Sequence, residues 1–221
     1  MPGGNSNHIR TYARLRGGIA IHNPNADASV PGGAYGTLGF IGTSDGADRW
    51  LVSCYHVLCR KNADFPPGAI EPIFHPVSQF EPAPVAVVSD ARANRQLDCA
   101  AALLLIPGMA LGQILGIGKL ADPSAPAVGM RVIKSGAETG VTEGFIVKIV
   151  GDEVEIAPLG YTVKPTEYEL SEGGDSGSLW IDAATSAPVA MHYRGSDRDT
   201  PERAFAKAIL PVLNTLQLRV V

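Results

Sequence analysis

The sequence lacks the features that mark membrane proteins and nucleic-acid-binding proteins. No apolar stretch reaches the roughly 18 residues that a membrane-spanning helix needs. The formal net charge of −4 is spread over 221 residues, with no block of like charges that could form a basic surface. We therefore expect neither a nucleic-acid partner nor a membrane partner.

Cysteine is scarce and odd in number. Of the three cysteines, Cys54 and Cys59 flank a histidine in SCYHVLCR, and Cys99 lies in LDCAAALLL. An odd number favours free thiols in a reducing compartment. The segment MPGGNSNHIRTYARLRGG also lacks the apolar core and cleavage site of a secretory signal, so we expect no export by this segment and a cytoplasmic location.

Short β-type runs bounded by glycine, proline and turn residues fill most of the chain and predict a mostly-β fold. Apolar residues at helical spacing occur in PERAFAKAILPVLNTLQL, where Pro211 predicts a closing helix from about Val212. We expect an N-terminal extension at 1–30, a first barrel at 31–110, a linker at 111–128, a second barrel at 129–203 and a C-terminal helical segment at 204–221, with the two barrels forming one domain.

The glycine-rich segment SEGGDSGSLW, residues 171–180, contains a candidate nucleophile, Ser176. A serine hydroxyl attacks a carbonyl when a base removes its proton, an acid orients that base and N–H groups receive the oxyanion. Glycine at position 174 lets the backbone turn tightly, because no β-carbon hinders it. We therefore expect the N–H groups of Gly174 and Ser176 to form an oxyanion hole.

A base and an acid stand upstream in suitable contexts. His56 follows an apolar run in WLVSCYHVLC, and Asp98 directly precedes one in QLDCAAALLLI. The order His, Asp, Ser is one of three unrelated orders of this triad. Taken singly, these residues have plainer interpretations as a core histidine, a cap residue and a turn serine, but their joint order favours catalysis. Three other histidines have no comparable context and are expected to be structural or surface residues: His8, His22 and His75.

These segments resemble those of trypsin-like serine peptidases of the chymotrypsin fold. SCYHVL, LDCAAALL and GGDSGSLW resemble the segments around the family's histidine, aspartate and serine. KSGAETGVTEG resembles a second-barrel hairpin of bacterial members, and VAMHYRG resembles the substrate-binding strand. The resemblance implies an all-β fold of two six-stranded antiparallel β-barrels with a C-terminal α-helix, the triad His56, Asp98 and Ser176 between the barrels, and neither cofactor nor metal.

Two segments depart from the family pattern. In zymogen-type relatives the acid before the serine, here Asp175, pairs with a newly cut amino terminus. LRGGIAIHN resembles such a cut site after Arg16 but lacks the Ile/Val-first terminus, so we expect another donor to hold Asp175, with regulatory cleavage as the alternative. Cys54 and Cys59 do not reproduce the family's disulfide at the histidine loop, which favours free thiols.

The resemblance also bears on specificity. It places Leu170 at the base of the pocket for the P1 side chain, which precedes the scissile bond. A basic P1 residue would need a buried acid there, so we expect an acidic or apolar one unless Glu172 changes the alignment. In glutamyl endopeptidases, which the chain also resembles, a histidine at the position of His192 meets the substrate carboxylate, with Ser171 and Arg194 as further candidates. The alternative is that His192 only packs between strands.

The sequence therefore predicts a serine endopeptidase that processes a specific protein or peptide substrate, and it leaves a regulatory partner protein open. The backbone of Tyr193, Arg194 and Gly195 is expected to pair with the substrate as an added strand. Two alternatives stay open: a catalytically silent peptide-binding module of the same fold, and an acyl hydrolase that cleaves small esters.

Overall fold

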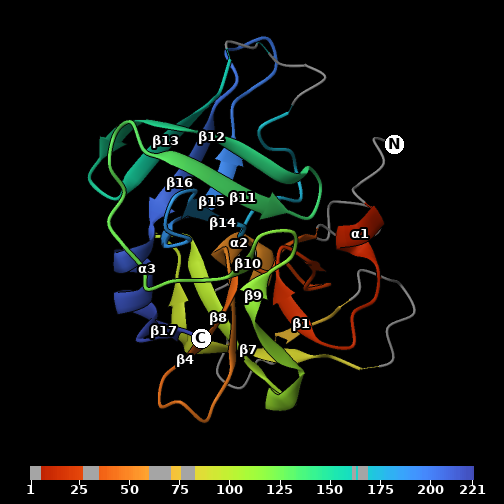
Figure 1. The fold of residues 1–221 in the computed structure, drawn as a ribbon. Helices are drawn as coiled ribbons and strands as arrows, with labels where there is room; N and C mark the ends of the chain where they lie inside the picture. The colour runs from red at the N-terminus through yellow and green to blue at the C-terminus, as the bar shows by residue number, and fades with distance from the viewer. Residues whose placement is uncertain (1–5, 27–34, 60–70, 76–82, 161–162, 164–168) are drawn as a thin grey trace.

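The protein is described by a computed structural model that covers residues 6–26, 35–59, 71–75, 83–160, 163 and 169–221. Two β units lie one above the other in Figure 1, and a short helix, α2 (Tyr55–Leu58), lies where they meet. The fold is mostly β, as the sequence predicts.

The upper unit in Figure 1 is a closed six-stranded antiparallel barrel with the order β11-β12-β13-β16-β15-β14. Its strands alternate between buried and outward residues; in β13, for example, Val154 and Ile156 are buried and the flanking Glu153 and Glu155 are not. Closure leaves no strand edge unpaired. The strands are β11 (Arg131–Gly136), β12 (Gly140–Val150), β13 (Glu153–Pro158), β14 (Leu179–Asp182), β15 (Pro188–Gly195) and β16 (Ala204–Ala208).

The lower unit is a six-stranded sheet with the order β17-β4-β5-β8-β7-β6. Within the described residues this sheet is open, because its edge strands β17 and β6 do not pair with each other, whereas the sequence predicted a closed first barrel. The strands are β4 (Phe40–Thr43), β5 (Trp50–Ser53), β6 (Pro72–Ile73), β7 (Ala86–Asn94), β8 (Cys99–Leu104) and β17 (Arg219–Val220).

The expected N-terminal extension and linker both contain strands. A parallel pairing joins β1 (Leu15–Gly17) to β9 (Ala110–Ile114), and β9 also pairs with β10 (Gly118–Lys119). A second small sheet joins β2 (Ala20–Ile21) to β3 (Gly36–Thr37). Residues 6–26 are therefore part of the packed fold rather than an appendage, because apolar residues such as Leu15 and Ile19 are fully buried.

The closing helix is shorter than expected and begins earlier than Val212. Residues 204–208 form β16 instead, since their alternating burial suits a barrel wall. Helix α3 (Ile209–Leu216) follows directly and accommodates Pro211 in its first turn, where no intrahelical N–H bond is lost. The other helical segments are α1 (Ser6–Ile9) and the 3₁₀ turn η1 (Pro107–Met109). No helix in the described ranges is long and apolar enough to cross a membrane.

The two units meet at backbone positions that have no room for a side chain. A β-carbon added at Gly39 would lie 2.3 Å from the carbonyl oxygen of Gly177, which follows Ser176 in the chain. One at Gly36 would lie 2.4 Å from Val57 in α2 and 2.9 Å from the carbonyl oxygen of Ser176. Glycine at these positions thus allows the segment around β3 to pass close to both α2 and the serine loop.

We predict that Gly39→Ala lowers the free energy of unfolding by about 1–3 kcal/mol, because the new methyl group must displace backbone. Gly108→Ala is the matched control, since a β-carbon there would meet nothing within 4 Å. Urea unfolding of both variants measures the difference, and equal midpoints would contradict the prediction.

Candidate active site

The structure brings His56 and Asp98 together. The chain leaves β5 and enters α2 at Tyr55, which places His56 in the first turn of that helix. Nδ1 of His56 lies 2.7 Å from Oδ2 of Asp98, and the backbone N–H of His56 donates to Oδ1 over 3.0 Å. A carboxylate that accepts from both groups fixes the ring orientation and leaves Nε2 as the proton acceptor.

Asp98 occupies the end of the turn between β7 and β8. Its φ of 49° lies in the left-handed region, which Asp tolerates better than most residues, and its N–H donates to the carbonyl of Arg95 over 3.3 Å. The side chain of Asp98 is 19% exposed, and that of His56 is 47% exposed. The imidazole is therefore accessible from solvent, with the carboxylate behind it.

Ser176 follows a tight turn in which the N–H of Asp175 donates to the carbonyl of Glu172 over 3.0 Å. Gly174 is the third residue of this turn and has a φ of 112°, which favours glycine. No residue in the described part of the chain accepts a hydrogen bond from the N–H of Gly174 or Ser176. Neither predicted oxyanion donor is thus engaged by a described residue.

Contacts from the first half of the chain position the serine loop. Thr37 donates from its backbone N–H to the carbonyl of Ser176 over 2.8 Å and from its hydroxyl to the carbonyl of Gly174 over 2.8 Å. The hydroxyl of Ser176 donates to the carbonyl of Tyr193 over 3.2 Å. In this arrangement the Ser176 hydroxyl is hydrogen-bonded to the predicted substrate-binding strand. Among the described residues, no hydrogen bond joins this hydroxyl to His56.

Asp175, directly before the serine, forms a buried ion pair. Its carboxylate lies 2.8 Å from Nζ of Lys134 in β11, and both side chains are fully buried. Thr139 donates to the same carboxylate from its hydroxyl over 2.6 Å and from its backbone over 3.1 Å. The backbone N–H of Glu138 adds a bond of 3.0 Å. The donor that the sequence analysis expected for Asp175 is therefore the β11–β12 hairpin.

The balance of these influences keeps Asp175 ionised. Burial alone raises the pKa of Asp175, but the ammonium of Lys134 and the hydrogen bonds from Lys134 and Thr139 outweigh burial and lower the pKa from 3.8 to about 2. The alternative of a cleavage after Arg16 finds no support, because Arg16 and Gly17 lie within β1, which pairs with β9.

The predicted substrate-binding residues divide into buried and accessible groups. Leu170 and Ser171 have no exposed surface, and His192 is 1% exposed. The His192 ring meets Trp180 edge-on, with their centroids 6.2 Å apart. Arg194 is exposed and its guanidinium stacks 3.9 Å above the ring of Phe205. Glu172 is also exposed, so it does not supply a buried acid beneath Leu170.

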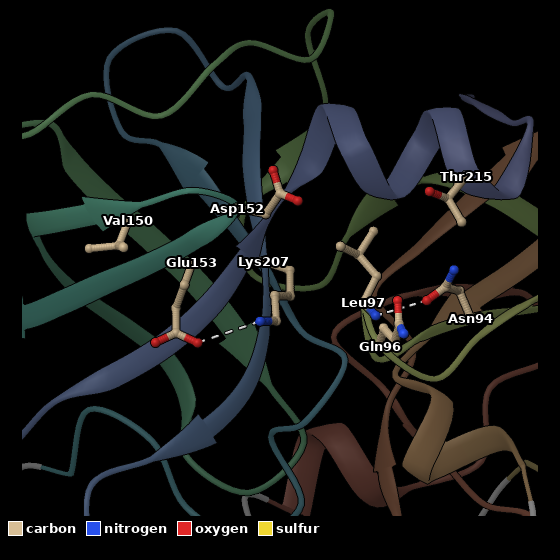
Figure 2. A pocket seen from close by; sticks show the side chains of 8 residues that line it. All are labelled: Asn94, Gln96, Leu97, Val150, Asp152, Glu153, Lys207 and Thr215. Atoms are coloured by element: carbon tan, nitrogen blue, oxygen red, sulfur yellow. Dashed lines mark hydrogen bonds and ion pairs between the residues drawn. The ribbon is translucent and has the colours of Figure 1, made fainter.

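A cavity of about 530 Å³ is lined by the β7–β8 turn, the barrel and α3, and neither Asp98 nor Ser176 is among its lining residues (Figure 2). Leu97 from the β7–β8 turn lines one side, and Glu153 and Lys207 from the barrel line another, with 3.4 Å between the ammonium and carboxylate. Glu153 also accepts a hydrogen bond of 2.7 Å from the hydroxyl of Tyr193. Glu153 thus links the cavity to β15, in which the carbonyl of Tyr193 accepts the hydrogen bond from the Ser176 hydroxyl.

Lys134 and Thr37 support the site but are not among the residues that the sequence predicts for it. Lys134 lies in the hairpin segment KSGAETG, and a lysine directly after the apolar strand residues Val132 and Ile133 was the available signal. Thr37 has no such signal, because its role depends on the approach of β3 to the serine loop. The sequence predicts structural or surface positions for the other three histidines, and the structure places all of them in the interior: His8, His22 and His75.

We predict that Lys134→Met lowers the free energy of unfolding by about 3–5 kcal/mol, because it leaves the Asp175 carboxylate buried without its counter-ion. The double variant Lys134→Met/Asp175→Asn removes both charges and should recover part of that loss. Chemical unfolding of the wild type, the single variant and the double variant measures the coupling.

The same pair sets a pH dependence. Since the folded pKa of Asp175 is depressed, its contribution is complete above about pH 4 and is lost as the pH falls toward 2. In Lys134→Met that loss should begin at higher pH. An unchanged acid-unfolding profile would contradict the assignment of Lys134 as the stabilising charge.

Neither a family model nor a curated protein matches the sequence. Solved structures match the fold along nearly the whole chain. A glutamic-acid-specific serine protease, described as using a novel histidine triad in substrate binding, is 21% identical with a TM-score of 0.69, and the match covers 94% of this chain and 100% of that one.

Two further bacterial structures agree. Nocardiopsis protease (NAPase) is 17% identical with a TM-score of 0.63, over 94% of this chain and 99% of its own. Thermobifida fusca protease A is 17% identical with a TM-score of 0.62, over 95% and 99%. At these identities the likeness concerns the fold, and it confirms the resemblance found in the sequence: the chain has the fold of bacterial chymotrypsin-type serine proteases.

Proposed function

We propose that the protein is a serine endopeptidase in which Ser176 is the nucleophile, His56 the general base and Asp98 the group that orients the base. The observation that carries this proposal is the pair of hydrogen bonds between His56 and Asp98. It is supported by a serine loop in which no described residue engages the N–H groups of Gly174 and Ser176. Similarity in fold to serine proteases supports the same reaction class.

In the proposed reaction the substrate displaces the hydroxyl bond from Ser176 to Tyr193 and brings its carbonyl against the serine loop. His56 takes the hydroxyl proton through Nε2 as Oγ attacks, and Asp98 stabilises the imidazolium. The N–H groups of Gly174 and Ser176 receive the oxyanion. His56 then returns the proton to the leaving amine, and water releases the acyl group by the same route.

We propose that the enzyme is constitutively active, because Asp175 is paired with Lys134 and needs no new amino terminus as its partner. In the proposed enzyme, Lys134 supplies the positive charge that stabilises Asp175 and thereby the turn that presents the Gly174 N–H. A partner protein is then not needed to complete the oxyanion hole. Limited processing of a specific protein remains our proposal for the physiological role, in a cytoplasmic setting.

For specificity we propose a P1 residue that is acidic or apolar and not basic. Two acids near the predicted pocket base do not provide a buried, unpaired carboxylate: Asp175 is paired with Lys134, and Glu172 is exposed. His192 is the candidate partner for a substrate carboxylate. It would act without a histidine triad, because its aromatic neighbour is Trp180. The other non-catalytic histidines have different neighbours: His8 bonds to Gly18, His75 bonds to Ala20, and the His22 ring lies against Phe74.

We predict that Ser176→Ala lowers casein or peptide cleavage by about 10⁴-fold or more, because the nucleophile is lost. Ser124→Ala, a change at a partly exposed serine outside the site, is the matched control and should keep full activity. A fluorophosphonate probe should label the wild type and the control but not Ser176→Ala. If the wild type is labelled and cleaves small esters but no peptides, the result would favour the acyl-hydrolase alternative. If the wild type is not labelled, the result would favour a silent binding module.

A peptide library with Glu, Leu or Arg at P1 tests the specificity, and we expect cleavage after Glu or Leu to exceed cleavage after Arg. If Glu is preferred, His192→Leu should lower kcat/KM for Glu peptides about 10- to 100-fold, because a hydrogen bond to a charged group is lost, while Leu peptides are affected less. A preference for Arg would contradict the proposed pocket. Equal effects on Glu and Leu peptides would show that His192 only packs.

A further inference from the structure

The thiol of Cys54 lies beside the two residues proposed as base and acid. Cys54 is the N-cap residue of α2, two positions before His56. One ligand atom from each of Cys54, His56 and Asp98 lies within 4.8 Å of the other two. The Cys54 thiol is fully buried and donates to the carbonyl of His192 over 3.1 Å. Sulfur, nitrogen and oxygen donors thus converge at one point of the site.

This donor set suits one class of ion. Zn²⁺ binds thiolate, imidazole and carboxylate, commonly with four ligands in a tetrahedron, whereas Mg²⁺ and Ca²⁺ take oxygen ligands. Metal–ligand distances of about 2.0–2.3 Å place the ligand atoms of a tetrahedral site about 3.3–3.8 Å apart. Ligand atoms at the 4.8 Å limit of the cluster would have to approach each other by about 1.0–1.5 Å on this measure. The half-exposed His56 ring gives solvent a side from which a fourth ligand, water, can enter.

Without metal the cluster does not disturb the His56–Asp98 pair. The Cys54 thiol donates its hydrogen bond to the carbonyl of His192. Nδ1 of His56 stays bonded to Asp98 over 2.7 Å. The pair can then work as a base and an orienting acid until an ion arrives.

We propose that Cys54, His56 and Asp98 form an inhibitory binding site for Zn²⁺. On binding, the Cys54 sulfur loses its proton to solvent and forms a bond to the metal, and one ring nitrogen of His56 and one carboxylate oxygen of Asp98 complete the protein ligands. The imidazole held by the metal no longer accepts the proton of Ser176. Binding stands on the ligand geometry alone, while inhibition rests on the proposed peptidase function.

The test begins with Co²⁺, whose bonds to thiolate give a charge-transfer absorption in the near ultraviolet. Titrating the full chain, kept reduced with a phosphine that binds metal weakly, should produce this band, and Zn²⁺ should abolish it by competition. Cys54→Ala should lack the band and lose at least about 100-fold in Zn²⁺ affinity, since removal of a direct ligand costs at least as much as loss of an outer-shell partner. Cys59→Ala is the matched control, because Cys59 is also buried and outside the cluster, and it should keep the band.

Peptide cleavage provides the second readout. Zn²⁺ should inhibit the wild type and Cys59→Ala alike, and Cys54→Ala should need at least about 100-fold more Zn²⁺ for the same inhibition. If Cys54→Ala does not fold, His56→Ala, a change at an exposed side chain, should also lose the cobalt band.

The outcomes separate the two proposals. A cobalt band that depends on Cys54 in a protein without peptidase activity would uphold the metal site and overturn the function. A wild type without the band, or one inhibited by Zn²⁺ equally with and without Cys54, would overturn the metal site.

Discussion

The ion pair between Lys134 and Asp175 is the interaction on which the site depends. Neither side chain has exposed surface, so each charge would be costly to bury without the other. Because Asp175 is covalently next to Ser176, its anchoring to the β11–β12 hairpin fixes where the serine loop begins. Gly136 in the same hairpin leaves room for this contact, since a β-carbon there would lie 2.2 Å from an Asp175 oxygen. The hairpin and the loop are therefore held together through Asp175.

The remaining half of the site comes from the other β unit and must approach this loop closely. The backbone of Thr37 bridges the two, and glycines at 36 and 39 remove the side chains that would hold them apart. His56 comes from α2, which follows β5, and Asp98 comes from the turn before β8. Both β5 and β8 are strands of the lower sheet. The relation between base and serine is thus set by backbone packing between the units more than by a direct bond.

Much of this arrangement can be predicted from the sequence, because it depends on local patterns. The strand runs and the glycine-rich turn follow from neighbouring residues. The order of His56, Asp98 and Ser176 is read directly along the chain, since each has its own local context. The pairing of β1 with β9 and the partner of Asp175 depend on contacts between distant segments, which no local pattern specifies. Strand β16 was not predicted because Ala206 and Ala208 suit a helix as well as a strand, and only closure of the barrel decides between them.

One pairing also constrains the order in which the molecule can form. Strand β17 returns from α3 to pair with β4, joining Arg219 to Thr43 and Val220 to Gly42. The sheet that carries Asp98 and leads into His56 therefore obtains its outer strand from residues made last among those described. Contacts between such distant segments form slowly, since a long loop must close first. During synthesis, the lower sheet stays unfinished at β4 until translation has passed Val220, well after Ser176 has been added to the chain.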